Sequence, residues 1–392
     1  MKRVASIGIA AGVLLAVVAG ASAGAYAGNG RPPCLVSNER TGLGSRSLQE
    51  GIDAAAAGDM LVVKGTCFGA STIDLDLKLK GVANPAFGIP TLDGTGFSRP
   101  VLAVDSGPCC TRLKADISNL TITHGSASGL AVTGYSGAEV RVRNTKVTGN
   151  AYGIETWEST LSLVDSSVKD NGSGISGGYA TTTLIDSVVS GNGGGLGGTR
   201  MGYALVRSAV RDNDGPGLAV GIVSSASVVD SVISGNASGG IALASFGSSW
   251  LQVTRSTITD NDGPGVTAPE GNAWLTDSTV SDNTTGGSGG GIYGDATLAN
   301  SRVTGNSAGL DGGGIAGSVT LTNSTVSGNT AGRFGGGIYV PEFRSATLND
   351  SSVTGNTAGV AGGGIYGTGT TVLNGTSSVC GNAPDDWPGC SP

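Results

Sequence analysis

The amino-acid sequence predicts an all-β solenoid of stacked parallel coils, and three observations support this. Asparagines recur along most of the chain at intervals of 21 to 27 residues. Each of them follows a short β-branched segment, and most precede a glycine-rich turn. Glycine contributes 71 of the 392 residues, about 18% against a usual share of roughly 7%. Short strands and tight turns at a fixed period are typical of solenoids, in which each coil buries its apolar face against the next.

The repeated unit has fixed positions, as Leu298–Asn306 illustrates. Ser301 and Val303 lie five and three residues before Asn306, an aliphatic lies eight before it, and a glycine run then leads to Ile315. We expect the aliphatic columns to form the core and the serines to fill a narrow bend. Stacked asparagines should bond from coil to coil through their amides. Eleven coils spaced about 4.8 Å apart would extend roughly 50 Å. The recurring asparagines are Asn150, Asn171, Asn192, Asn213, Asn236, Asn261, Asn283, Asn306, Asn329, Asn356 and Asn382.

The two ends of the solenoid need covers, because open strand edges invite aggregation. Residues 47–57 place Leu48, Ile52 and Ala55 on one helical stripe, which predicts an N-terminal helical cap. The first strand is expected to follow at Met60. The β-helix with its cap is therefore expected over residues 47–382, after a loose leader at 24–46 and before a C-terminal cap or tail at 383–392.

The N-terminus has the pattern of a bacterial secretory signal. A basic start is followed by the apolar run Ile7–Val18 and the small-residue site Ala21–Ala23. We expect a signal peptide at residues 1–23, with a second cleavage site after residue 27. The apolar run is shorter than the roughly 20 residues of a membrane span. The mature protein is expected to be secreted, extracellular or at the cell surface, with no membrane span.

Six cysteines suit an oxidising compartment. We expect the disulfides Cys34–Cys67 and Cys380–Cys390, the second of which would close the C-terminal end. The pairing of the adjacent Cys109 and Cys110 stays open. No Cys-x-x-Cys pair occurs, so a zinc site has little support.

Two sets of motifs resemble known families. The helix followed by Gly65–Cys67 resembles the start of secreted right-handed parallel β-helix proteins of the pectate-lyase-like superfamily. The runs Gly290–Tyr293, Gly336–Tyr339 and Gly363–Tyr366, each after a Val-x-x-Asn, are similar to repeats of chlamydial polymorphic membrane proteins. The resemblance spans residues 45–382 and implies a right-handed parallel β-helix. This chain has Val or Ile where those repeats have Phe, so an adhesive role is implied only weakly.

Charge and histidine content exclude several classes of function. The net charge is −7, which argues against steering toward nucleic acid or an anionic membrane. His124 is the one histidine, so a metal site with several histidines is excluded and a serine triad would depend on this residue. The sequence favours an exposed turn position for His124.

A column of Asp, Asn and Arg lies six residues before ten of the eleven recurring asparagines. Asp165 and Asp186 should lie about 5 Å apart on adjacent coils, and Arg207 follows on the next coil. Such carboxylates could hold Ca²⁺ or act as a retaining glycosidase pair. The competing interpretation, which the sequence favours, is a solvated column of mixed charge that needs no cofactor.

Two further groups are candidates for substrate binding. The basic residues Arg141, Arg143 and Lys146 should point outward and could hold a uronic-acid polymer. The tyrosines form a second column, which Ala316 interrupts; they could stack on sugar rings or simply stabilise neighbouring coils. These tyrosines are Tyr293, Tyr339 and Tyr366.

The sequence therefore favours a non-catalytic, monomeric surface or extracellular protein that presents a polar face to a polysaccharide or a surface protein. One alternative is a polysaccharide lyase or glycoside hydrolase acting near Asp165, Asp186 and Arg207. Another is a structural envelope protein. The short 21-residue spacing in this part of the chain argues against large loops and a deep cleft there.

Overall fold

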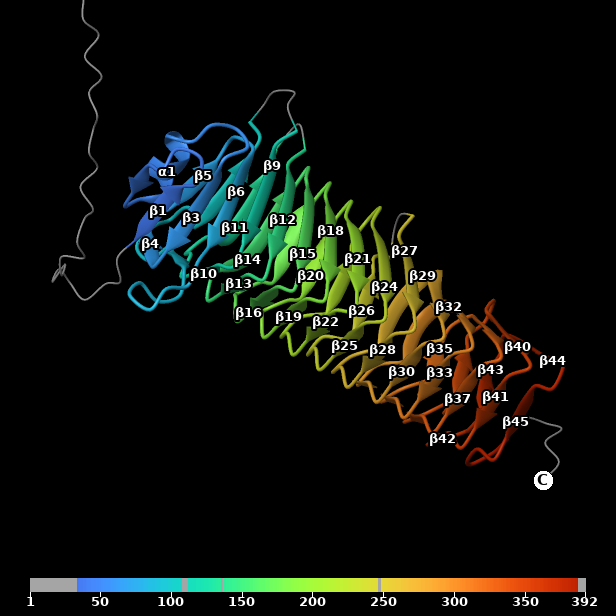
Figure 1. The fold of residues 1–392 in the computed structure, drawn as a ribbon. Helices are drawn as coiled ribbons and strands as arrows, with labels where there is room; N and C mark the ends of the chain where they lie inside the picture. The colour runs from blue at the N-terminus through green and yellow to red at the C-terminus, as the bar shows by residue number, and fades with distance from the viewer. Residues whose placement is uncertain (1–33, 108–111, 135–136, 246–247, 387–392) are drawn as a thin grey trace, which may run out of the picture. The chain divides into compact units, whose positions relative to one another are not determined.

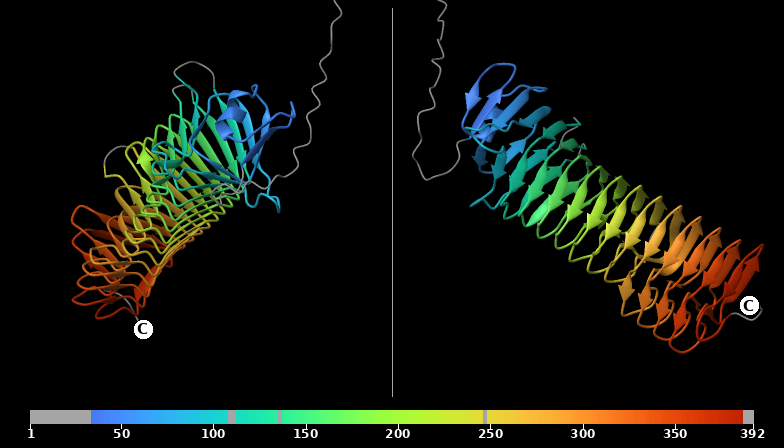
Figure 2. Two further views of the ribbon diagram at one scale, coloured as in Figure 1. Left: turned by 90° about the vertical axis from the view of Figure 1, so that its left-hand side faces the viewer. Right: turned by 60° about the horizontal axis from the view of Figure 1, so that its bottom comes forward.

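The structure is a computed structural model that describes residues 34–107, 112–134, 137–245 and 248–386. It confirms the parallel β-solenoid. The strands form sheets of 27, 14 and 4 members, in which equivalent strands of successive coils pair in parallel (Figure 1). Figure 2 shows the strands of neighbouring coils side by side.

One coil illustrates how the sequence repeat becomes structure. It consists of β17 (Ile175–Gly178), β18 (Thr181–Ile185) and β19 (Val188–Ser190). The first two strands belong to the 27-stranded sheet and the third to the 14-stranded sheet. The expected aliphatic positions Ile175, Leu184 and Val189 are buried. Leu184 pairs with Leu205 of β21 (Gly202–Val206) in the next coil, so the apolar columns stack in register and form the core.

Single residues in the left-handed backbone region make the bends. Asp186 links β18 to β19 with φ +49°, and Gly191, just before Asn192, has φ +63°. The column from Asn119 to Asp350 keeps φ between +43° and +58°. Asn and Asp tolerate this conformation better than most residues, which explains why they recur there.

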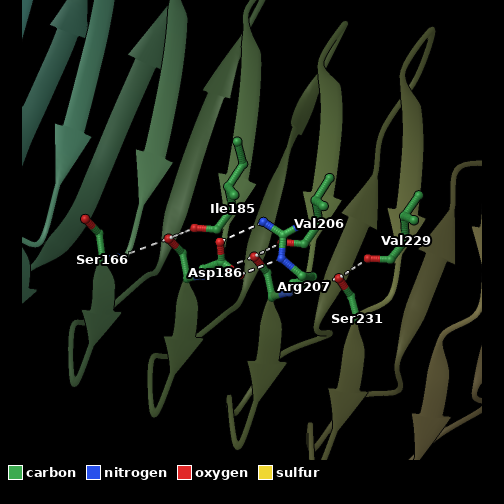
Figure 3. A network of polar contacts seen from close by, with 9 residues as sticks. Ser166, Ile185, Asp186, Val206, Arg207, Val229 and Ser231 are labelled. Atoms are coloured by element: carbon green, nitrogen blue, oxygen red, sulfur yellow. Dashed lines mark hydrogen bonds and ion pairs between the residues drawn. The ribbon is translucent and has the colours of Figure 1, made fainter.

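The predicted asparagine ladder is confirmed, and the buried serines form a second ladder of hydrogen bonds that was not predicted. Asn192 donates from Nδ2 and from its backbone N–H to Oδ1 of Asn213, at 3.0 and 3.1 Å. The Ser187 hydroxyl donates to the carbonyl of Ile185, and its Oγ accepts from the backbone N–H of Ser166 at 3.1 Å (Figure 3). Both ladders are buried, so they satisfy polar groups at corners that water does not reach.

The N-terminal helix α1 (Leu48–Asp53) is shorter than expected. Ser47 caps it by accepting from the backbone N–H of Glu50, and buried Leu48 and Ile52 cover the first coil. The chain leaves the helix after Ala54, since Asp59 accepts the backbone N–H of Ala56 in a turn instead.

The prediction of a loose leader at 24–46 is wrong for the part from Leu35 to Ser45, which contains two strands. β1 (Leu35–Asn38) pairs antiparallel with β3 (Met60–Lys64) and with β2 (Gly44–Ser45). Val36 is buried against the core, so this segment covers the edge of the first coil. The predicted Cys34–Cys67 disulfide is present and ties β1 to β4 (Thr66–Phe68).

The solenoid also begins before the first recurring asparagine. β4, β7 (Thr91–Asp93) and β10 (Thr121–Thr123) are the first three of the 14 strands in their sheet. They lack the asparagine but keep the inward apolar residue, so counting asparagines gave too few coils. The last strand of this sheet is β45 (Ser378–Cys380).

Some predictions fall on residues outside the described ranges. These are the signal peptide, the open pairing of Cys109 and Cys110, and the expected Cys380–Cys390 disulfide, of which Cys390 lies outside these ranges. Within the ranges that the structure describes, no helix is long and apolar enough to cross a membrane.

Candidate functional site

An open hollow of about 970 Å³, here called the crease, follows the left-handed corner column in the N-terminal half of the solenoid. One wall is the segment after β6 (Leu77–Gly81), which includes Ile89 and Pro90. The crease crosses five successive coils, along the corners that follow the paired strands β6, β9 (Lys114–Ser118), β12 (Glu139–Arg143), β15 (Thr160–Val164) and β18. The polar side chains used below are Lys80, Asn119, Asn144, Lys146, Asp165 and Asp186.

The candidate carboxylates Asp165 and Asp186 both line the crease. Arg207 of the next coil does not, and instead binds both carboxylate oxygens of Asp186 through Nε and Nη2, each at 2.8 Å (Figure 3). This bonding and the nearby positive charge hold the pKa of Asp186 below its usual range. The two side chains stay 38% and 56% exposed, so the pair is solvated.

The same arrangement recurs further along the corner column. Arg255 binds both oxygens of Asp230, at 2.7 and 2.8 Å. Asn144 donates to Oδ1 of Asn119 at 2.8 Å. The column is therefore a series of pairs between neighbouring coils, which agrees with the interpretation as a mixed-charge surface. In a left-handed position, an arginine gains an ion pair with the preceding coil.

The three basic candidates occupy different surroundings. Lys146 lines the crease. Arg143 donates to Asp116 and lines an adjoining hollow of about 380 Å³. Arg141 is exposed on the same strand, β12, outside both hollows.

Two lysines of β6 were missed from the sequence. Lys80 lines the crease and the adjoining hollow, and Lys78 lines the hollow alone. The alternation Leu77-Lys78-Leu79-Lys80 was the available signal, because it places both lysines outward on one strand. They lie before the recurring asparagines, where the repeat offers no guide.

The tyrosine column lies in the C-terminal half. Tyr293 pairs in register with Ala316, Ala316 with Tyr339, and Tyr339 with Tyr366. The strands are β32 (Ile292–Ala299), β35 (Ile315–Ala316), β39 (Ile338–Val340) and β43 (Ile365–Gly367). The Tyr366 ring stacks on Phe334 with centroids 4.6 Å apart.

His124 is exposed in a left-handed turn, as expected, with φ +56°. Its Nδ1 lies 3.1 Å from Oδ2 of Asp93, a partner that the sequence did not indicate. Burial acts to raise the pKa of Asp93, but hydrogen bonds with Thr95 and His124 outweigh it and lower the pKa. Across the described ranges, no group of three or more His, Cys, Asp or Glu residues is arranged to hold a metal ion.

Comparison with known proteins gives a family for the fold. The family model described as "right handed beta helix region" matches residues 107–252 and 223–379. Nothing among the curated proteins matches the chain.

Several solved structures are similar at low identity. A double mutant of the periplasmic alginate epimerase AlgG is 13% identical, covering 84% of this chain and 86% of its own, with a TM-score of 0.48. The Azotobacter vinelandii mannuronan C-5 epimerase AlgE4 A-module is 16% identical, covering 83% and 94%, with a TM-score of 0.46. The Dettilon tailspike protein is 13% identical, covering 75% and 62%, with a TM-score of 0.40. On the family model, which matches more than half of its length, the chain belongs to the right-handed β-helix family.

Proposed function

We propose that this protein is a secreted, non-catalytic polysaccharide-binding protein, and that the crease holds an acidic glycan. The observation that carries the proposal is the crease itself, an elongated open hollow with lysines and amides along its length. Five coils at about 4.8 Å per step make it roughly 19 Å long, which suits an extended chain of several sugar residues. The signal-like N-terminus and the Cys34–Cys67 disulfide support export.

Charge favours an acidic polymer in the crease. Lys80 and Lys146 line it, while Arg207 offsets the charge of Asp186. Asp165 is then the one lining carboxylate without an ion pair among those that the structure gives. Ammonium groups would contact sugar carboxylates, and the amides of Asn119 and Asn144 would contact hydroxyls.

A polysaccharide lyase or hydrolase is the second candidate, because Asp165 and Asp186 line the same crease. The ion pair with Arg207 argues against it. A general acid needs a raised pKa so that it keeps its proton near neutral pH, whereas the pKa of Asp186 is lowered. Asp186 could serve only as an ionised partner in such a reaction.

The test is retention of the mature protein on immobilised polyuronate and neutral polysaccharides, with product release measured in parallel. Lys80→Gln with Lys146→Gln should weaken binding to polyuronate at least tenfold. Lys114→Gln with Arg302→Gln is the control, because it removes the same charge from exposed residues outside the crease. Equal retention of both double variants would overturn the proposal. Product release that Asp165→Asn with Asp186→Asn abolishes would establish the enzyme instead.

A further inference from the structure

The interruption of the tyrosine column leaves a slot one coil high. Tyr293 and Tyr339 lie two coils apart, so their backbones are separated by roughly 9.6 Å. Ala316 lies between them and is buried, with no side chain beyond its β-carbon. A hollow of about 320 Å³ is lined by Tyr293, Ala316 and Tyr339. It therefore offers room for one ring at the level where the column lacks one.

A turn after β39 forms another part of this slot. Pro341 and Arg344 line it, and Arg344 donates to a carboxylate oxygen of Asp295, two coils earlier. The other oxygen of Asp295 accepts the backbone N–H of Ser318 at 2.9 Å. Asp295 also lines the slot and its side chain is only 21% exposed, so the ion pair is held in a defined place.

Phe343 lies at the tip of the same turn and is 94% exposed, with φ +62°. A bulky side chain is unfavourable in this backbone region, and an aromatic ring is unfavourable in water. Nothing in the solenoid's own packing accounts for a phenylalanine here. It lies in the chain between Pro341 and Arg344, which both line the slot, although Phe343 itself is not a lining residue.

We infer that the slot binds a neutral pyranose ring. Tyrosine faces pack against the C–H groups of a sugar ring. Sugar hydroxyls both donate and accept, which matches a carboxylate beside a guanidinium, as in Asp295 and Arg344. These two charges cancel, and they are the charged lining residues of the slot. An anionic sugar therefore gains no net attraction, in contrast to the crease.

Filling the slot is the most direct test. Ala316→Tyr would complete the column, and three other coils already accommodate tyrosine at this position. The probes are β-1,4-linked hexaoses of glucose, mannose and galactose, with affinity measured by titration calorimetry. Ala316→Tyr and Tyr339→Ala should each weaken binding of the preferred hexaose at least tenfold. Thermal unfolding of each variant checks that it is folded.

Two controls separate the slot from the crease. Tyr366→Ala removes a tyrosine of the same column outside the slot, and Lys80→Gln with Lys146→Gln alters only the crease; both should bind the hexaose like the parent. Failure of all three hexaoses to bind the parent would overturn the inference, as would unchanged binding by folded Ala316→Tyr. Loss of hexaose binding in the lysine variant alone would also overturn it, because the sugar would then occupy the crease.

Discussion

Single residues determine the bends, and the position before each recurring asparagine shows this most clearly. The residue there has a positive φ in coil after coil, whether it is Gly328 at +65° or Asp282 at +56°. L-residues other than Asn and Asp rarely adopt this conformation, because the β-carbon crowds the following carbonyl. The high glycine content of the chain thus partly reflects a backbone requirement.

We predict that Gly328→Ala destabilises the fold by about 1 kcal/mol, because a β-carbon in the left-handed region is strained. The added carbon would meet no atom closer than 3.9 Å, so a clash does not contribute. Gly328→Asn should be milder. Gly194→Ala is the control, since Gly194 has no positive φ and open space around it. Urea unfolding midpoints measure all three, and equal midpoints for the two alanine variants would contradict the strain argument.

At the scale of elements, the asparagine ladder joins the coils along a buried corner. Asn306 Oδ1 accepts from both the backbone N–H and Nδ2 of Asn283, and its own Nδ2 donates to Asn329. Each rung thus satisfies two donors of the preceding coil. A hydrophobic side chain of similar size would fill the space but leave the backbone N–H of Asn283 buried without a partner, whereas Asn283 Nδ2 keeps the carbonyls of Ile258 and Ser281.

Asn306→Leu should therefore lower the free energy of unfolding by on the order of 2 kcal/mol, since the buried backbone N–H of Asn283 loses its acceptor. Thr297→Leu introduces the same side chain at an exposed position of β32 and should change little. Thermal unfolding followed by circular dichroism compares the two. A similar melting temperature for Asn306→Leu and the parent would show that the ladder contributes no stability.

At the scale of the whole described solenoid, a carboxylate anchors each end. Asp386 ends the asparagine ladder by accepting from the backbone N–H and Nδ2 of Asn382, as the next asparagine would. Burial raises its pKa, but these bonds and one from Gly381 outweigh burial and lower it. At the other end, hydrogen bonds from Arg40, Asn38 and the Ala56 backbone lower the pKa of Asp59.

Acid should loosen both ends before the middle. A lowered pKa in the folded state contributes stability that is fully present above the unfolded value of roughly 3.9 and is lost progressively as the pH falls from that value through the folded pKa. Coils contact mainly their neighbours, so the ends can open separately. Hydrogen exchange at pH 3 and pH 6 should show protection of Asn382 and Gly381 falling while central coils stay protected.

Asp386→Asn should abolish this acid sensitivity at the C-terminal end, because an amide keeps an oxygen acceptor and does not titrate. The N-terminal end, with Asp59 intact, should remain acid-sensitive and serves as the internal reference. Loss of protection in the central coils first would rule out end-anchoring carboxylates.

The sequence by itself determined the solenoid, the inward columns and the asparagine ladder. Each coil repeats the same alternation, and a side chain such as Leu184 or Asn192 can satisfy its burial or hydrogen bonding only by stacking on its equivalent. The repeated pattern within one coil therefore also predicts how successive coils stack. The Cys34–Cys67 pair was also predictable, because few cysteines flank the first folded segment.

Only the tertiary structure decided which exposed residues share a hollow. Lys80 belongs to a coil that lacks the recurring asparagine, whereas Lys146 lies four residues before Asn150, and the segment with Ile89 that walls the crease lies between these two coils. The Arg344–Asp295 contact spans 49 residues and depends on where one turn folds back. Outward side chains are not packed against equivalent residues, so the sequence shows no repeat at these positions. Their contacts can therefore be identified only in the stacked coils.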